Sequence, residues 1–244
     1  MTAQARLSAK NLALTVTFTA LYVVFGFIRI SPIIGLPGQA ITAAAMMAPL
    51  VGIILGPYIG TLSALFGGII GFFFGSFALP SLASGVAATF CSGMIRISKR
   101  TVSVIFYLLL LLFLAFYPTI GPLWLLPMYL WFQIIGLVIL TLPLPFTSTK
   151  TLNSTNDSKL VVAFLVTCLT STLAGQIAGS LTFELILTAD LSYWLSTWGV
   201  TMVYYPVERA IIAVFSALIG VSLHKVLKDA KLMPVLNHAS CEEK

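Results

Sequence analysis

Long uninterrupted apolar runs are the feature that most constrains how this chain can fold. The ten residues from Tyr107 to Phe116 are all apolar, and the whole chain is 59% hydrophobic and only 8% charged. Soluble domains carry about 25% charged residues. A chain of 244 residues could not hide this much apolar surface from water, whereas lipid removes the need to hide it. The sequence therefore predicts an integral membrane protein.

The continuity of these runs decides between the two structures that can cross lipid, helical bundles and closed barrels. Barrel strands show segments of about ten residues that alternate between apolar and polar. No such alternation interrupts the apolar runs, so we expect an all-α, polytopic helical bundle. At about 20 residues per span, the chain holds six to eight helices and no soluble domain. Residues 1–244 are thus predicted to form a single transmembrane domain.

Proline, glycine and polar residues divide the apolar sequence into about eight expected helices. Their expected ranges are Asn11–Ile30, Gln39–Leu55, Tyr58–Phe77, Ser81–Ile97, Val102–Phe116, Ile120–Pro145, Leu160–Leu187 and Trp194–Leu223. Residues 146–159 form the one long polar linker. The first run is too long for a signal-peptide core and no small-residue cleavage site follows it, so it is interpreted as a membrane helix. The second and fourth helices are short enough to be re-entrant.

The positions of the basic residues predict the orientation of the bundle. An N-terminus in the cytoplasm, followed by regular alternation, places 11 of the 13 basic residues inside, as the positive-inside rule requires. They are Arg6, Lys10, Arg96, Lys99, Arg100, Lys150, Lys159, Lys225, Lys228, Lys231 and Lys244. We therefore expect a multi-pass protein of the cell membrane with both termini in the cytoplasm. The net charge of +6 then reflects topology and does not predict a nucleic-acid partner.

Small residues recur at four-residue spacing in three of the expected helices, which lets helix backbones approach closely in lipid. Packing within the chain explains the stripes Gly67/Gly71/Gly75 and Gly175/Gly179. The stripe of Ala9, Ala13 and Thr17 begins at the cytoplasmic surface, where a second protein can reach it. We therefore predict a partner-docking surface there, with packing inside the chain as the alternative.

Ionisable residues at bilayer depth are costly and usually functional. The candidates are Arg29, Glu184, Glu208 and Arg209, of which the last two lie deepest. Adjacent side chains on a helix diverge by about 100°, so Glu208 and Arg209 cannot both face one neighbour. One of them is expected to be free to meet a ligand. The alternative is that these charges only satisfy one another, for example Arg209 with Glu184.

Polar amides and aromatic rings accompany these charges. Gln39 and Gln176 add hydrogen-bonding groups, and Trp198, Tyr204 and Tyr205 add rings that can stack on a flat ligand. We therefore predict a substrate-binding pocket in the outer half of the membrane. It should lie between the first, seventh and eighth helices and the first outer loop.

Signals of catalysis or of bound metal are lacking. The sequence has no zinc-binding His-Glu-x-x-His, no phosphate-binding loop and no closely spaced carboxylate pair. The three cysteines, Cys91, Cys168 and Cys241, are far apart and match no metal-ligand spacing. We expect a protein that is not an enzyme and that uses no cofactor or metal.

Two segments together resemble the substrate-binding S components of energy-coupling factor transporters. Thr19–Phe73 has a first helix with small residues at its cytoplasmic end, a Pro/Gly-containing outer loop, a short helix ending in Leu-Gly-Pro and a glycine-rich helix. Tyr204–Lys228 resembles the family's last helix, with its basic cytoplasmic end. The family usually has six helices, so residues 102–145 are interpreted as an inserted helical hairpin.

The resemblance implies a subunit that captures a vitamin-like small molecule from outside the cell. A transmembrane coupling subunit, docked on the first helix, and cytoplasmic ATPases would then drive uptake. Two other functions remain open from the residues: a self-sufficient secondary transporter, which predicts broken helices and inverted repeats, and a membrane scaffold or assembly protein without a substrate. The sequence does not name the substrate.

Overall fold

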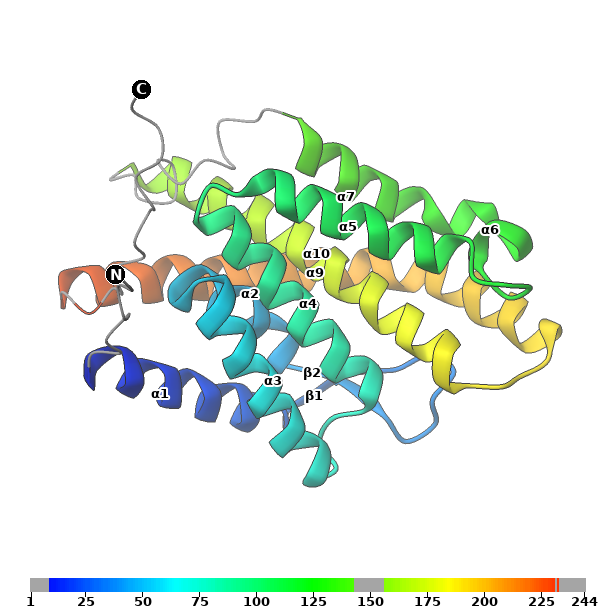
Figure 1. Cartoon of the computed structure of the whole chain (residues 1–244), viewed down its shortest axis with the longest axis horizontal. Helices are drawn as coiled ribbons and strands as arrows, with labels where there is room; N and C mark the ends of the chain where they lie inside the picture. The colour runs from blue at the N-terminus through cyan, green and yellow to red at the C-terminus, as the bar shows by residue number, and fades with distance from the viewer. Residues whose placement is uncertain (1–8, 143–155, 231, 233–244) are drawn as a thin grey trace, which may run out of the picture.

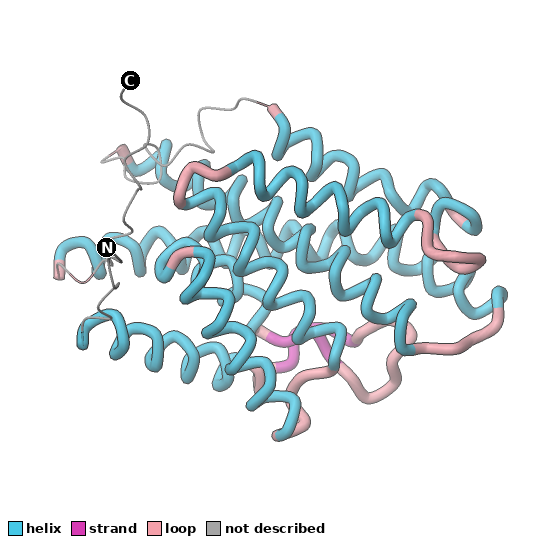
Figure 2. The backbone as a smooth tube through the Cα atoms, in the orientation of Figure 1, coloured by secondary structure: helices cyan, strands magenta, loops and turns pink. Residues whose placement is uncertain are grey.

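The computed structural model describes residues 9–142, 156–230 and 232, which are almost entirely helical (Figures 1 and 2). The helices are α1 (Ala9–Phe25), α2 (Ala44–Leu55), α3 (Pro57–Phe73), α4 (Leu79–Arg96), α5 (Arg100–Ala115), α6 (Pro122–Leu125), α7 (Trp131–Thr141), α9 (Asp157–Ile186) and α10 (Leu191–Asp229), with a 3-10 turn η1 (Pro127–Leu130) before α7. They run roughly side by side along the long axis. The expected all-α fold is confirmed.

A short β-hairpin between α1 and α2 was not predicted. We expected the first helix to continue to Ile30, but it ends at Phe25, and β1 (Arg29–Pro32) pairs antiparallel with β2 (Ala40–Thr42). The tip of the hairpin contains Gly35 and Gly38, both at positive φ, a conformation that favours glycine. Arg29 therefore lies on a strand and not at the end of a helix.

The sixth expected helix, Ile120–Pro145, is also wrong as a single element. Pro122 begins the short helix α6, and Pro127 follows Leu126, whose backbone is not helical, so the chain restarts as η1 and then α7. Proline has no N–H to donate and disfavours a helical conformation in the residue before it. This break places Tyr129 on η1.

The polar linker 146–159 falls largely outside the described residues, because the structure describes the chain again only from Asn156. The Asn156 side chain accepts a hydrogen bond from the Lys159 backbone N–H at 3.4 Å, which caps α9. The last residues of the predicted linker therefore form the first turn of α9. The second expected helix begins at Ala44 and not at Gln39, because Ala40–Thr42 form β2, and the last continues to Asp229. The remaining expected helices agree with the structure to within a few residues at each end.

Helix α4 packs against α2, α3 and α9, and glycines allow the close approach. A Cβ atom added at Gly52 would lie 2.1 Å from Ser92 Oγ, and one added at Gly175 would lie 2.6 Å from the Ser84 carbonyl oxygen. Neither position has space for a larger side chain. The predicted internal packing role of the Gly175/Gly179 stripe is thereby confirmed at Gly175.

The exterior of the bundle carries many large apolar side chains. Phe73, Phe113 and Val203, on three different helices, are each more than 60% exposed. Helices α9, with 30 residues, and α10, with 39 residues, are long and apolar enough to cross a membrane. Five shorter apolar helices of 10–17 residues accompany them.

Basic side chains gather at one end of the bundle. Figure 1 shows the start of α1, the α4–α5 turn, the start of α9 and the end of α10 at the same end. Lys225 of α10 forms an ion pair with Asp157 of α9 at 2.8 Å, and Arg100 donates from Nε to the Leu140 carbonyl of α7 at 2.6 Å. The β-hairpin and the connection from α3 to α4 lie away from this basic end.

Candidate functional site

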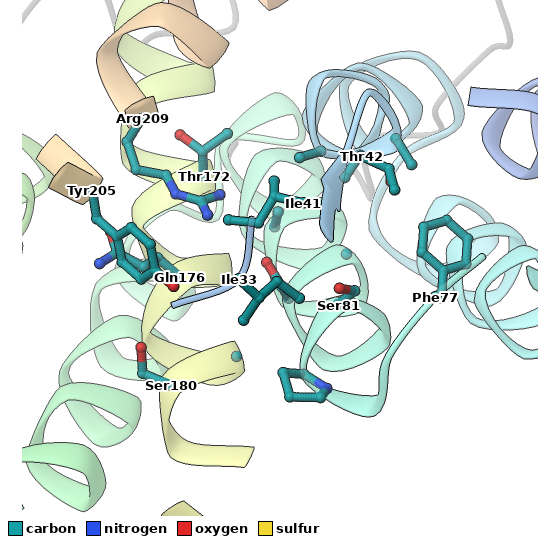
Figure 3. A pocket seen from close by; sticks show the side chains of 18 of the residues that line it. Ile33, Ile41, Thr42, Phe77, Ser81, Thr172, Gln176, Ser180, Tyr205 and Arg209 are labelled. Atoms are coloured by element: carbon teal, nitrogen blue, oxygen red, sulfur yellow. The ribbon is translucent and has the colours of Figure 1, made fainter. Parts of the chain in front are cut away.

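A cavity lies between the β-hairpin and helices α1, α2, α4, α9 and α10 (Figure 3). Its volume is about 70 Å³, measured as the space open to the centre of a water-sized sphere. One water molecule needs roughly 10–15 Å³ on this measure, so the cavity has room for several waters or one compact ligand. Most of its wall is apolar or small, and the polar side chains come mainly from α4, α9 and α10.

Helix α9 presents a polar stripe to the cavity. Thr172, Gln176 and Ser180 follow one another at four-residue intervals, which places them on one face of the helix. Thr172 donates its hydroxyl to the Cys168 carbonyl at 2.8 Å, so its hydrogen is already used. The amide oxygen of Gln176 is buried and has no hydrogen-bond partner among the described residues.

Tyr129 connects two members of this stripe from behind. Gln176 Nε2 donates to the Tyr129 hydroxyl oxygen at 3.5 Å, and the Tyr129 and Ser180 hydroxyls are 3.2 Å apart. All three side chains are at least nine-tenths buried. This small network fixes the polar groups on one wall of the cavity.

Helix α10 contributes a cation and an aromatic ring. Arg209 and Tyr205 are one turn apart, and the guanidinium carbon of Arg209 lies 5.7 Å from the centre of the Tyr205 ring. Arg209 Nη2 also lies 3.5 Å from Glu208 Oε1, with both side chains about 6% exposed. The Nε atom of Arg209 has no hydrogen-bond partner within the described part of the chain.

Three of the predicted site residues line the cavity: Gln176, Tyr205 and Arg209 (Figure 3). Glu208 does not line it but is paired with Arg209. This contact between the two adjacent charges was not among the expected pairings, and of the two residues only Arg209 lines the cavity. The alternative pairing of Arg209 with Glu184 is not among the described ion pairs.

Other predicted site residues lie away from the cavity. Arg29 and Gln39 occupy exposed positions of the β-hairpin, and Tyr204 is 42% exposed on the outside of α10. Trp198 is buried behind the cavity wall, where Nε1 donates to the Ile120 carbonyl at 3.0 Å and the ring lies 4.7 Å from that of Tyr129. The structure does not bring these four residues to the cavity.

Glu184 is buried in a different way. It continues the α9 stripe one turn beyond Ser180, is only 3% exposed, and does not line the cavity. Neither of its carboxylate oxygens has a hydrogen-bond partner in the described segments. A buried carboxylate without a partner carries a large desolvation cost in its charged form.

The sequence interpretation missed several lining residues. Ser180 and Thr172 could have been found from Gln176, because i±4 positions share a helix face. Tyr22 of α1, and Ser81 and Ser84 of α4, gave no comparable signal. The contribution of α4 in particular depends on how the whole bundle packs.

The predicted docking stripe lies on the outer face of α1. Leu14, Phe18 and Tyr22 are buried against the bundle, whereas Ala13 and Thr17 are exposed. The third member, Ala9, is the first residue of the helix. Nothing in the described structure covers this face.

The site offers binding groups and no obvious catalytic or metal-binding set. Among the described residues, no group of three or more His, Cys, Asp or Glu side chains lies close enough together to hold a metal ion. The cavity lining contains hydroxyls, an amide, a guanidinium and a phenol. Such a set can orient a small polar molecule through hydrogen bonds and ring contacts.

Comparisons with known proteins do not identify a relative. No protein-family model matches the sequence, and neither a curated protein nor a solved structure matches it.

Proposed function

We propose that this chain is a polytopic integral membrane protein of the cell membrane, with both termini in the cytoplasm. The apolar exterior and the two long apolar helices support this proposal. Helix α2, with 12 residues, is only about 18 Å long and cannot cross a hydrocarbon core of about 30 Å. Because most of its side chains are buried inside the bundle, it has no need to face lipid.

The basic end of the bundle would face the cytoplasm. Cytoplasmic loops of membrane proteins are enriched in lysine and arginine. Arg96, Lys99 and Arg100 surround the α4–α5 turn, while Lys225 and Lys228 lie on the last turns of α10. The cavity would then lie in the half of the membrane nearer the outside.

Within that frame, we propose that the chain is the substrate-binding subunit for uptake of a compact, vitamin-like small molecule. The observation that carries the proposal is the cavity itself, with its partly unused hydrogen-bonding groups Gln176 and Arg209. Buried polar groups are normally satisfied, so a ligand that completes their bonds is a direct explanation. Tyr205 and the apolar wall would hold its flat body.

Separate subunits would supply the energy. The resemblance to S components implies a transmembrane coupling subunit and cytoplasmic ATPases as partners. The exposed face of α1, with Ala13 and Thr17, is a suitable docking surface because small side chains let a second helix approach closely. The described residues include no phosphate-binding loop that could make the chain an ATPase itself.

The decisive experiment is mass spectrometry of the small molecules that copurify with the detergent-solubilised protein. Ala45 lines the cavity, so Ala45→Phe should fill it and abolish copurification. Ala210→Phe places the same ring on the exposed face of α10 and is the matched control. One compound should be enriched with wild type and the control and lost from Ala45→Phe. Equal amounts in all three proteins, or no enriched compound, would contradict a binding role for the cavity.

A self-sufficient secondary transporter is the second candidate, and the Glu184 carboxylate, which has no hydrogen-bond partner among the described residues, favours it. Buried carboxylates act as proton carriers in such transporters, and the α6–η1–α7 break fits their interrupted helices. Proteoliposomes that contain only this chain would distinguish the two. Accumulation driven by a pH gradient would favour the secondary transporter, whereas binding without accumulation would favour the subunit.

A further inference from the structure

The inserted hairpin reaches the wall of the cavity through Tyr129. The break at Pro127 turns the chain into η1, and Tyr129 on this turn is 1% exposed. Its ring packs 4.7 Å from that of Trp198, and its hydroxyl meets Gln176 and Ser180 of α9. Tyr129 therefore lies directly behind the polar stripe.

The hydrogen bonds of the Tyr129 hydroxyl determine which end of the Gln176 amide it holds. A phenol has one hydrogen to donate, and its oxygen can accept. Gln176 Nε2 donates to the Tyr129 oxygen, and the phenol hydrogen can then be donated to Ser180 Oγ, its other partner. The Gln176 side chain, which lines the cavity, is thus held by its nitrogen end, and its buried oxygen has no partner among the described residues.

We propose that Tyr129 is a positioning residue that holds Gln176 as a hydrogen-bond acceptor, so that the cavity selects a ligand with an N–H donor. This inference rests on the proposed binding function of the same cavity. Arg209 lines the neighbouring wall of the cavity, and its Nε–H has no hydrogen-bond partner among the described residues. Its guanidinium can donate a hydrogen bond to an acceptor on the same ligand. A compact planar ring in which an N–H adjoins a carbonyl, a cyclic amide or lactam, presents both groups on one edge.

The alternative role for Tyr129, plain filling of the interior, has a direct comparison within the same hairpin. Tyr107 on α5 is also fully buried, but its hydroxyl donates to the Gln133 backbone carbonyl at 2.8 Å. Both partners of that hydrogen bond belong to the hairpin 102–145. Tyr107 does not line the cavity, and its hydroxyl does not contact the α9 stripe. Tyr107→Phe and Tyr129→Phe remove the same atom from equally buried sites, but only the second releases Gln176.

The test compares two pairs of probes on purified protein: uracil with 1,3-dimethyluracil, and 2-pyridone with N-methyl-2-pyridone. Methylation removes the N–H donor and keeps the carbonyl. Wild type and Tyr107→Phe should each bind at least one N–H compound about tenfold or more tightly than its methylated partner. Tyr129→Phe should lose most of that preference, because the freed amide can turn either end toward the ligand. Gln176→Leu should lose it as well.

Three results would overturn the inference. One is that wild type shows no preference for an N–H compound in either pair, which is what a Gln176 that presents its nitrogen to the shared carbonyl would give. Another is a preference for the methylated compounds, which would mean that no acceptor of the cavity meets the N–H. The third is full preference in Tyr129→Phe. The copurification experiment keeps these failures separate from the proposed function: a retained compound without an N–H donor would leave the binding role standing and remove only this inference.

Discussion

Arg209 has two roles at the site, because it lines the cavity and also neutralises the buried Glu208 carboxylate. Its guanidinium lines the cavity, lies over Tyr205 and is paired with Glu208 at 3.5 Å. Breaking a buried pair by removing one partner typically costs about 3–5 kcal/mol, because the other charge is left alone. A single substitution at Arg209 therefore mixes lost ligand contact with lost stability.

A double variant separates the two effects. Arg209→Met should lower both thermal stability and ligand affinity, whereas Glu208→Gln/Arg209→Met removes both charges and should recover most of the stability. Affinity for the copurifying compound should stay about 10- to 150-fold below wild type in the double variant, which corresponds to a lost charge-assisted bond of about 1.5–3 kcal/mol. Thermal melts and ligand titration measure the two quantities.

Glu208→Gln alone is the control for this pair. Glu208 does not line the cavity, so the single variant should keep affinity within about threefold of wild type. If the double variant binds normally, Arg209 serves only to neutralise Glu208, and the ligand is held by other groups.

The sequence predicted polar residues that line the cavity, but it did not predict the buried residue that holds one of them in place. Gln176, Tyr205 and Arg209 stand out because polar residues are rare in so apolar a chain. Tyr129 does not stand out, because a tyrosine among apolar residues is also typical of interior packing. Its role depends on the break at Pro127 and on the position of η1 against α9, and both are tertiary features.

At the scale of elements, α1 has two unlike faces. Its buried face packs on α2 and α3, and its other face exposes Ala13 and Thr17. The Thr17 hydroxyl donates a hydrogen bond to the Ala13 carbonyl of the same helix at 2.8 Å. The hydrogen of this exposed polar side chain is therefore already bonded within α1. Such a face suits close packing against a second membrane helix.

A bulky substitution on that face tests docking directly. Ala13→Trp should abolish uptake in cells and copurification with a membrane partner, because the indole prevents the close approach, while ligand binding by the isolated protein is retained. Ala210→Trp, on the exposed face of α10, is the matched control and should leave uptake unchanged. Normal uptake by Ala13→Trp would show that no partner docks there.

Most helices were predictable because their ends carry proline, glycine or charge. Gly56-Pro57 separates α2 from α3, and Pro80 lies in the first turn of α4. The β-hairpin was missed because each strand has only three or four residues and adjoins an apolar helix. An apolar run of that length does not reveal whether it is strand or helix.

At the scale of the whole molecule, the cavity lies apart from the basic end of the bundle. The described basic residues other than Arg29 and Arg209 lie near the end formed by the α4–α5 turn, the start of α9 and the end of α10. The β-hairpin, which covers the cavity, lies away from that end. If the basic end is cytoplasmic, the cavity lies in the part of the bundle nearer the outside.

Labelling of single cysteines with a membrane-impermeant thiol reagent tests this orientation. Lys99 lies in the α4–α5 turn and Ser192 in the first turn of α10, and both are exposed. In a background with Cys91, Cys168 and Cys241 replaced, Ser192→Cys should react in intact cells. Lys99→Cys should react only after the membrane is opened, because the positive-inside rule places its turn in the cytoplasm. Reaction of Lys99→Cys in intact cells, with Ser192→Cys protected, would invert the bundle and place the cavity near the cytoplasm. A protein so oriented could not capture its ligand from outside, and export would then be the more consistent function.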